Sequence, residues 1–86
     1  MSWESRADRI DHSAPEPVWR QVADDLRAQV TSGELAAGAR LPSNPELGEI
    51  YGVARLTAVK AINLLKDEGL LIVVNGRGTF VARKQT

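Results

Sequence analysis

An Asn-Gly dipeptide near the C-terminal end of the chain is the feature that most restricts its fold. The dipeptide, Asn75-Gly76, follows the aliphatic and β-branched run 70–74 and precedes a second such run at 79–83. Both residue types tolerate positive φ angles, and tight hairpin turns require such angles. The sequence therefore predicts a two-stranded β-hairpin at this end of the chain.

Three segments before the hairpin carry apolar residues at the three- and four-residue steps of a buried helix face. They span about residues 17–32, 44–51 and 54–68, and a glycine follows each of them. Ser43 is the expected N-cap of the second helix, and Glu46 completes a capping box with it. Three helices followed by a β-hairpin wing make an α+β fold, mainly α, of the winged helix-turn-helix type.

The length of 86 residues suits one domain with a small core. We expect a flexible N-terminal tail over residues 1–16, the winged helix over 17–83 and a C-terminal tail over 84–86. Trp3 and Ile10 are apolar residues in the first tail that could dock on the domain. Residues 39–41, in the loop before the second helix, can add a short edge strand.

The inventory of side chains excludes most catalytic and metal sites. The chain has no cysteine, and its one histidine, His12, lies in the expected N-terminal tail. Disulfides, thiolate zinc sites and Ser/His or Cys/His nucleophile pairs are therefore excluded. No apolar run approaches the roughly 18–20 residues of a membrane span. We expect a protein of the reducing cytoplasm that is not an enzyme and has no cofactor, metal or membrane partner.

The formal charge of the chain is zero, but the charges are divided unequally along it. Residues 1–53 carry five arginines and nine acids, a net charge of −4, and residues 54–86 carry six cations and two acids, a net charge of +4. A basic second half indicates an anionic partner, although a solvated charged surface would give the same count.

Several separated motifs occur together in the order and spacing of one family. They are the stretch 32–43, Glu46-Leu47, Tyr51-Gly52-Val53, Arg55, Thr57, Leu65, Glu68-Gly69-Leu70 and the stretch 76–81. In this combination the chain resembles the N-terminal DNA-binding domain of bacterial repressors of the GntR family. The resemblance implies a transcriptional regulator whose third helix enters the major groove of double-stranded DNA, with the wing at the adjacent minor groove. It also implies a homodimer on an inverted repeat, because a two-fold axis requires a palindromic site.

The resemblance assigns DNA contacts to the third helix. Arg55 matches the first recognition arginine of the family and can bind guanine or a phosphate through two hydrogen bonds. Thr57 matches a threonine that reaches phosphate. On the outward face, Lys60 can reach the DNA backbone or base edges, and Asn63 can reach adenine.

We expect four more DNA contacts outside the third helix: three at the turn of the wing and one at the start of the second helix. Gly76 allows the wing backbone to approach the sugar-phosphate chain, and Arg77 can enter the minor groove or bind phosphate. Asn75 can also enter the minor groove or bind phosphate. The geometry of the turn alone would also explain why Asn75 and Gly76 stand at these positions. Ser43 can cap the second helix and donate to phosphate at the same time.

Two positions depart from the family pattern. Many members carry an arginine where Val59 stands, and Pro45 takes the place of another arginine early in the second helix. Leu56 and Val59 are apolar on the outward face, where they could contact thymine methyl groups or pack against the wing or the tail. We therefore expect DNA recognition that differs from that of the family or is weaker. The alternative function is a winged helix that binds another protein through this surface.

Family members usually continue beyond this domain into a ligand-sensing and dimerising domain. The chain corresponds either to an isolated DNA-binding fragment or to a minimal protein, and the sequence does not decide between them. It indicates no small-molecule effector.

Overall fold

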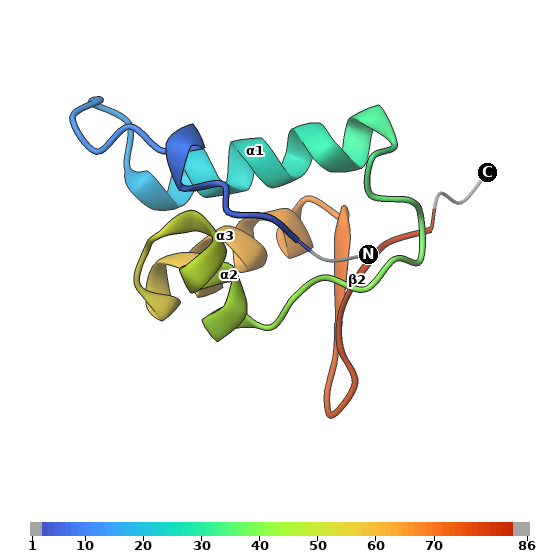
Figure 1. The fold of residues 1–86 in the computed structure, drawn as a ribbon. Helices are drawn as coiled ribbons and strands as arrows, with labels where there is room; N and C mark the ends of the chain where they lie inside the picture. The colour runs from blue at the N-terminus through green and yellow to red at the C-terminus, as the bar shows by residue number, and fades with distance from the viewer. Residues whose placement is uncertain (1–2, 84–86) are drawn as a thin grey trace.

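The computed structural model describes residues 3–83 and shows three helices followed by a two-stranded hairpin (Figure 1). The elements are a short 3-10 helix η1 (Ala7–Arg9), the helices α1 (Val18–Ser32), α2 (Asn44–Tyr51) and α3 (Arg55–Asp67), and the strands β1 (Leu71–Val74) and β2 (Gly78–Val81). This order confirms the predicted winged helix-turn-helix fold. The C-terminal tail predicted at 84–86 lies outside the described residues.

The core forms where α1 and α2 pack against α3. The buried residues of α3 are Ala58, Ala61, Ile62 and Leu65, which recur at three- and four-residue steps. Val22 and Leu26 of α1 and Leu47 and Tyr51 of α2 are fully buried against this face. The two alanines of α3 leave room for these larger side chains, as close packing of a small core requires. Within residues 3–83 no helix has both the length and the apolar character needed to cross a membrane.

The hairpin is anchored at its base and projects away from the helices at its turn (Figure 1). It is antiparallel, with Leu71 opposite Val81 at the base and Val74 opposite Gly78 at the tip. Leu71 and Val81 belong to the core, whereas Val74 is exposed. The strands cover residues 71–74 and 78–81 instead of the predicted 70–74 and 79–83, and one further hydrogen bond, from the Ala82 N–H to the Leu70 carbonyl oxygen at 2.9 Å, extends the pairing toward the core.

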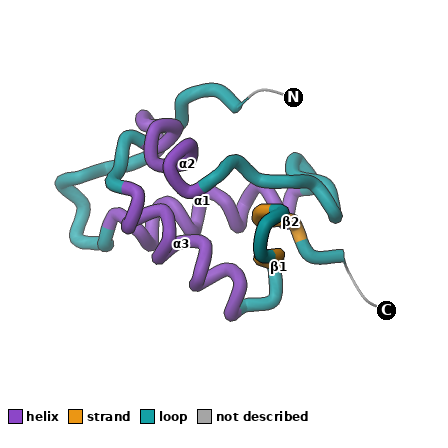
Figure 2. Tube along the Cα trace, turned by 90° about the horizontal axis from the view of Figure 1, so that it is seen from below, coloured by secondary structure: helices purple, strands orange, loops and turns teal. Residues whose placement is uncertain are grey.

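The loop between α1 and α2 runs beside the hairpin (Figure 2). The edge strand predicted at residues 39–41 is reduced to a single bridge between Arg40 and Phe80. The Leu41 N–H donates a hydrogen bond to the Thr79 carbonyl oxygen at 2.8 Å. This loop therefore ties the wing to the start of α2.

Two features of α2 fix the helix-turn-helix geometry. The predicted capping box is present: Ser43 Oγ accepts the Glu46 N–H at 3.3 Å, and Glu46 Oε1 accepts the Ser43 N–H at 2.9 Å. Inside the helix, a Cβ on Gly48 would lie 2.8 Å from the Val53 carbonyl oxygen. The Val53 N–H donates to the Gly48 carbonyl at 2.8 Å. Glycine at this position therefore allows the turn before α3 to fold tightly against α2.

The described part of the segment before α1, residues 3–17, packs on the domain, and Trp3 and Ile10 of the expected N-terminal tail dock there as the sequence allowed. Ile10 belongs to the core, and the Arg6 N–H donates to the Ile50 carbonyl oxygen at 2.7 Å. The Arg6 guanidinium also donates to both carboxylate oxygens of Asp25, at 2.6 and 3.1 Å. The ion pair with Asp25 and two apolar side chains, Trp3 and Ile10, rather than a periodic apolar face, hold this segment in place.

The Asp25 carboxylate lies at the centre of a polar cluster that joins the N-terminal segment, α1 and α2. Its Oδ2 atom accepts the Tyr51 hydroxyl at 2.6 Å and the Gln29 amide at 3.2 Å. Burial raises the pKa of Asp25, but the hydrogen bonds from Arg6 and Tyr51 outweigh burial and hold it below its ordinary value. Burial and the bond to Asp25 raise the pKa of Tyr51, so its hydroxyl remains a proton donor.

Candidate nucleic-acid interface

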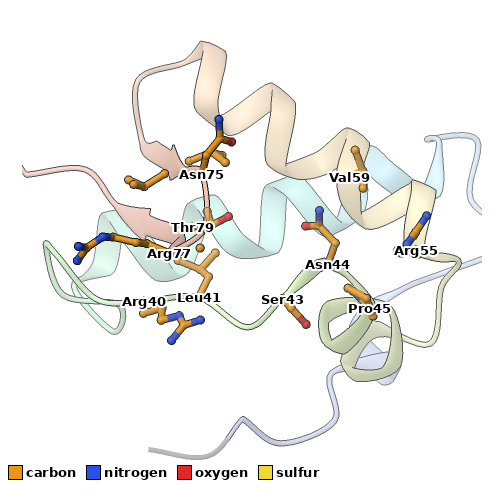
Figure 3. Close-up of a pocket in the computed structure, with 14 residues that line it drawn as sticks. Arg40, Leu41, Ser43, Asn44, Pro45, Arg55, Val59, Asn75, Arg77 and Thr79 are labelled. Atoms are coloured by element: carbon orange, nitrogen blue, oxygen red, sulfur yellow. The ribbon is translucent and has the colours of Figure 1, made fainter.

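An open groove of about 610 Å³ lies between the start of α2, one side of α3 and the wing (Figure 3). Six of the ten residues for which we predicted DNA contacts line this groove: Ser43, Arg55, Val59, Asn75, Gly76 and Arg77. They come from three segments that are separated in the sequence, and the tertiary fold brings them together. The groove therefore has the composite origin expected of a binding site.

The other four predicted residues lie on α3 outside the groove: Leu56, Thr57, Lys60 and Asn63. Leu56 is 70% exposed, Lys60 and Asn63 are exposed and Thr57 is half-buried. Since Leu56, Lys60 and Asn63 follow one another at four- and three-residue steps, they share the outward face of the helix. α3 thus has a groove side, with Arg55 one turn before Val59, and an adjacent outward face.

Arg40 lines the same groove, although its sequence context did not mark it as a DNA contact. Its side chain passes over Gly78, where an added Cβ would lie 3.1 Å from the guanidinium Nε atom. Successive side chains of an extended chain point to opposite sides. Because Leu41 is buried, the alternation of apolar and polar residues at 39–41 could have indicated that Arg40 faces outward. The other lining residues that we had not proposed as contacts are Leu41, Asn44, Pro45, Val73, Val74, Gly78 and Thr79.

The residues that line the groove carry positive charge. Arg40, Arg55 and Arg77 border it, and among its described lining residues there is no aspartate or glutamate. Within residues 3–83, the ion-paired arginines are different ones: Arg6 and Arg9 pair with Asp25, and Arg27 pairs with Asp24 and Glu68. The three groove arginines are therefore available to an anionic partner.

The turn of the wing presents its backbone to solvent. Gly76 has a φ of 77°, and no atom lies within 4 Å of the place where its Cβ would be. The left-handed backbone favours glycine here, as predicted. The positive φ that was also expected at Asn75 is not observed: at this end of the hairpin the positive φ angles belong to Gly76 and Gly78. The open surroundings also leave the backbone accessible to a large partner. Arg77 follows directly, and its N–H donates to the Val74 carbonyl at 3.0 Å.

The side chains that line the groove are of the kinds that bind nucleic acid. Over residues 3–83, no group of three or more His, Cys, Asp or Glu side chains is placed to hold a metal ion. The groove combines three cations with hydroxyl and amide groups, and these are the side chains that proteins use to contact phosphates and base edges.

Comparison with known proteins gives a consistent result. The model of a family described as bacterial regulatory proteins, gntR family, matches residues 19–81. The HTH-type transcriptional repressor NagR of Bacillus subtilis (strain 168) is 39% identical over 74 residues, which are 86% of this chain and 30% of NagR. The chain therefore spans less than a third of the length of this curated relative.

Solved structures with the same fold include DNA-binding domains. YtrA from Sulfolobus acidocaldarius, a GntR-family transcription factor, superposes with a TM-score of 0.81 at 38% identity, over 88% of this chain and 80% of YtrA. AraR(DBD), in complex with operator ORX1, superposes with a TM-score of 0.78 at 33% identity, over 85% of this chain and 94% of that one. The chain belongs to the gntR family of bacterial regulatory proteins, and it carries the helix-turn-helix DNA-binding domain of that family.

Proposed function

We propose that the domain binds operator DNA as a homodimer on an inverted repeat and represses transcription at the nucleoid, in the bacterial cytoplasm. The observation that carries the proposal is the convergence of Arg40, Arg55 and Arg77 on one groove without an acidic lining residue. Contacts from arginine and lysine to phosphate supply a large share of the affinity of proteins for DNA. The repressor name of NagR and the operator complex of AraR(DBD) support the same function.

In the proposed complex α3 enters the major groove. A helix with its side chains is about 10–12 Å across, and the major groove of B-DNA is about 12 Å wide. Arg55 is the first residue of α3, and recognition helices contact base edges with their N-terminal residues. Arg55 binds guanine or phosphate, Asn63 reaches adenine, and Thr57 and the Ser43 hydroxyl donate to phosphates.

The wing lies at the adjacent minor groove. Asn75, Gly76 and Arg77 form the projecting end of the hairpin, so they reach DNA beside the segment that α3 occupies. Arginine is attracted to the negative potential of a narrow minor groove. Arg40 brings a second cation to the wing side of the groove. Two arginines that many family members carry are absent from this chain, because Pro45 and Val59 stand at their positions.

In this proposal the apolar residues Leu56 and Val59 of α3 contact the methyl groups of thymines. Leu56 is 70% exposed, and burying one methyl group is worth about 0.8 kcal/mol, or roughly four-fold in affinity. Replacing a contacted thymine by deoxyuridine removes only that methyl group. We expect a roughly four-fold loss of affinity at each contacted thymine for the parent protein, and a smaller loss for the Leu56→Ala variant.

Selection from a random duplex library tests the function and gives the operator, its spacing and its symmetry together. We expect an inverted repeat, and we expect Arg55→Ala to lose affinity for it. Each neutralised phosphate contributes about −0.9 to the slope of log K against log salt, so the three groove arginines of each of two subunits alone contribute roughly −5 to that slope. Enrichment of no motif at low salt would rule out the operator proposal.

Exposure of Leu56 favours a second candidate, a winged helix that binds another protein. An exposed apolar residue beside Val59, which is half-buried, would suit an apolar partner surface. The two candidates differ in salt dependence, because a largely apolar contact does not weaken steeply as salt rises, whereas counterion release makes DNA binding do so.

A further inference from the structure

A tryptophan on α1 holds the one cation of the outward face of α3. The Lys60 ammonium lies 5.3 Å from the centre of the Trp19 ring, and the Arg20 guanidinium carbon lies 5.5 Å from it. Trp19 is half-buried near the start of α1, whereas Arg20 and Lys60 are exposed. Within residues 3–83, neither cation forms an ion pair with a carboxylate. An aromatic ring, rather than an acid, is therefore the partner of Lys60.

The position of Lys60 on α3 shows on which side of the helix its ammonium lies. Arg55 and Val59 line the groove on the wing side of the helix. Lys60 comes one turn after Leu56 on the outward face and leans toward α1, away from that groove. A helix that fills the major groove has a phosphate ridge on each side. The wing-side arginines can reach one ridge, and Lys60 is placed beside the other.

We infer that Trp19 is a positioning residue that holds the Lys60 ammonium for a DNA phosphate on the side of the major groove remote from the wing. The inference rests on the proposed function. It adds Trp19 to the binding surface as the residue that orders Lys60. The domain would then hold both phosphate ridges, one through the groove arginines and one through Lys60.

The physical basis is the flexibility of lysine. Lysine has a long side chain with many rotamers, and ordering it on binding costs conformational entropy. A cation–π contact within about 6 Å restrains the ammonium before DNA arrives and leaves its other side open to a phosphate oxygen. For an exposed contact, the energy of this restraint corresponds to about a two- to five-fold change in affinity.

A double-mutant cycle tests the coupling between the two residues. The four proteins are the full chain, Trp19→Leu, Lys60→Ala and the double variant, each titrated with the duplex recovered by selection. We expect Lys60→Ala to lower affinity and to reduce the magnitude of the salt slope by about 0.9 per subunit. We expect Trp19→Leu to weaken binding about two- to five-fold when Lys60 is present and to have no effect when residue 60 is alanine.

Three controls separate positioning from a general structural role. Trp19→Phe keeps an aromatic face and should retain most of the affinity. Lys66→Ala removes the same charge from another exposed position of α3, and its effect should add to that of Trp19→Leu without coupling. In the free protein, NMR should show the ε-methylene protons of Lys60 shifted upfield by the ring current, and Trp19→Leu should remove the shift.

The outcomes are distinct. Additive losses from Trp19→Leu and Lys60→Ala, tighter binding by Trp19→Leu, an unchanged salt slope in Lys60→Ala, or unshifted Lys60 protons would each overturn the inference. If Arg55→Ala loses binding while the cycle shows no coupling, the proposed function stands and this inference fails. If the parent chain selects no duplex at all, the proposed function itself fails.

Discussion

Removal of the Asp25 carboxylate tests whether one polar cluster holds the N-terminal segment to the helix-turn-helix. The carboxylate accepts hydrogen bonds from Arg6 at 2.6 and 3.1 Å, from Tyr51 at 2.6 Å and from Gln29 at 3.2 Å. The side chains of Arg6 and Asp25 are 20% and 12% exposed. In an Asp25→Ala protein the Arg6 guanidinium can turn toward water, whereas the buried Tyr51 hydroxyl loses the acceptor for its proton.

The size of the effect follows from these contacts. Hydrogen bonds to charged groups contribute about 1.5–3 kcal/mol each without adding fully, and a buried donor left without an acceptor costs about 1–3 kcal/mol. The higher helix propensity of alanine offsets at most about 0.7 kcal/mol. We expect Asp25→Ala to lower the free energy of unfolding by about 3 kcal/mol. For a domain of this size that corresponds to a fall in Tm of roughly 12–24 °C.

Thermal unfolding followed by circular dichroism provides the measurement, and Asp24→Ala is the matched control. Asp24 is the neighbouring acid on α1, its side chain is 49% exposed, and its pairing with Arg27 is a surface contact. Such pairs contribute about 0–1 kcal/mol, and the gain in helix propensity is the same for both variants. The reasoning is refuted if Asp25→Ala unfolds at the same temperature as Asp24→Ala. Below its Tm the Asp25→Ala protein should still bind DNA, because Asp25 lies outside the groove.

The remaining predictions concern acid, the α2–α3 turn and the base of the wing turn. The pKa of Asp25 is lower in the folded than in the unfolded state, so its stabilisation is complete above the ordinary value of about 3.9 and is lost as the pH falls below it. As the pH is lowered from neutral to acid, the free energy of unfolding should therefore fall more steeply for the parent than for Asp25→Ala. Gly48→Ala should lower the free energy of unfolding by about 1–3 kcal/mol in urea titrations, because its Cβ would meet the Val53 carbonyl oxygen at 2.8 Å. Gly78→Ala should cost about 1–3 kcal/mol in the same assay and should weaken DNA binding, since its φ is 117° and the Arg40 side chain would have to move.

The helices and the hairpin could be predicted because local patterns encode them. Ser43 and Glu46 lie three residues apart and form a capping box, which indicates the start of α2 from local sequence alone. The docking of the N-terminal segment could not be predicted in the same way, since Arg6 and Asp25 are separated by 19 residues and carry no periodic signal. Which charged residues pair across such a sequence separation depends on the tertiary fold.

The candidate site shows the same division between local pattern and tertiary contact. Arg55 could be proposed from the sequence because the family motif around it fixes its place at the start of α3. Arg40 was missed because its position over Gly78 depends on the bridge between the loop and Phe80, a contact between distant segments. The contact between Lys60 and Trp19 is likewise long-range, so the sequence indicated Lys60 but not what holds it.

A chain without net charge can bind a polyanion when its fold separates paired from unpaired cations. The acids of α1 are occupied by ion pairs: Asp25 with Arg6 and Arg9, and Asp24 with Arg27, which also binds Glu68. The groove arginines have no such partners in the described chain, and salt screens charges beyond about 8–10 Å. A phosphate in the groove therefore experiences the nearby arginines far more strongly than the ion-paired acids of α1. The Glu46 carboxylate, which accepts the Ser43 N–H at 2.9 Å, is an acid that does lie beside the groove and acts on Arg40. The affinity for DNA and its salt dependence should follow the number of unpaired cations beside the phosphates, not the sum of charges over the chain.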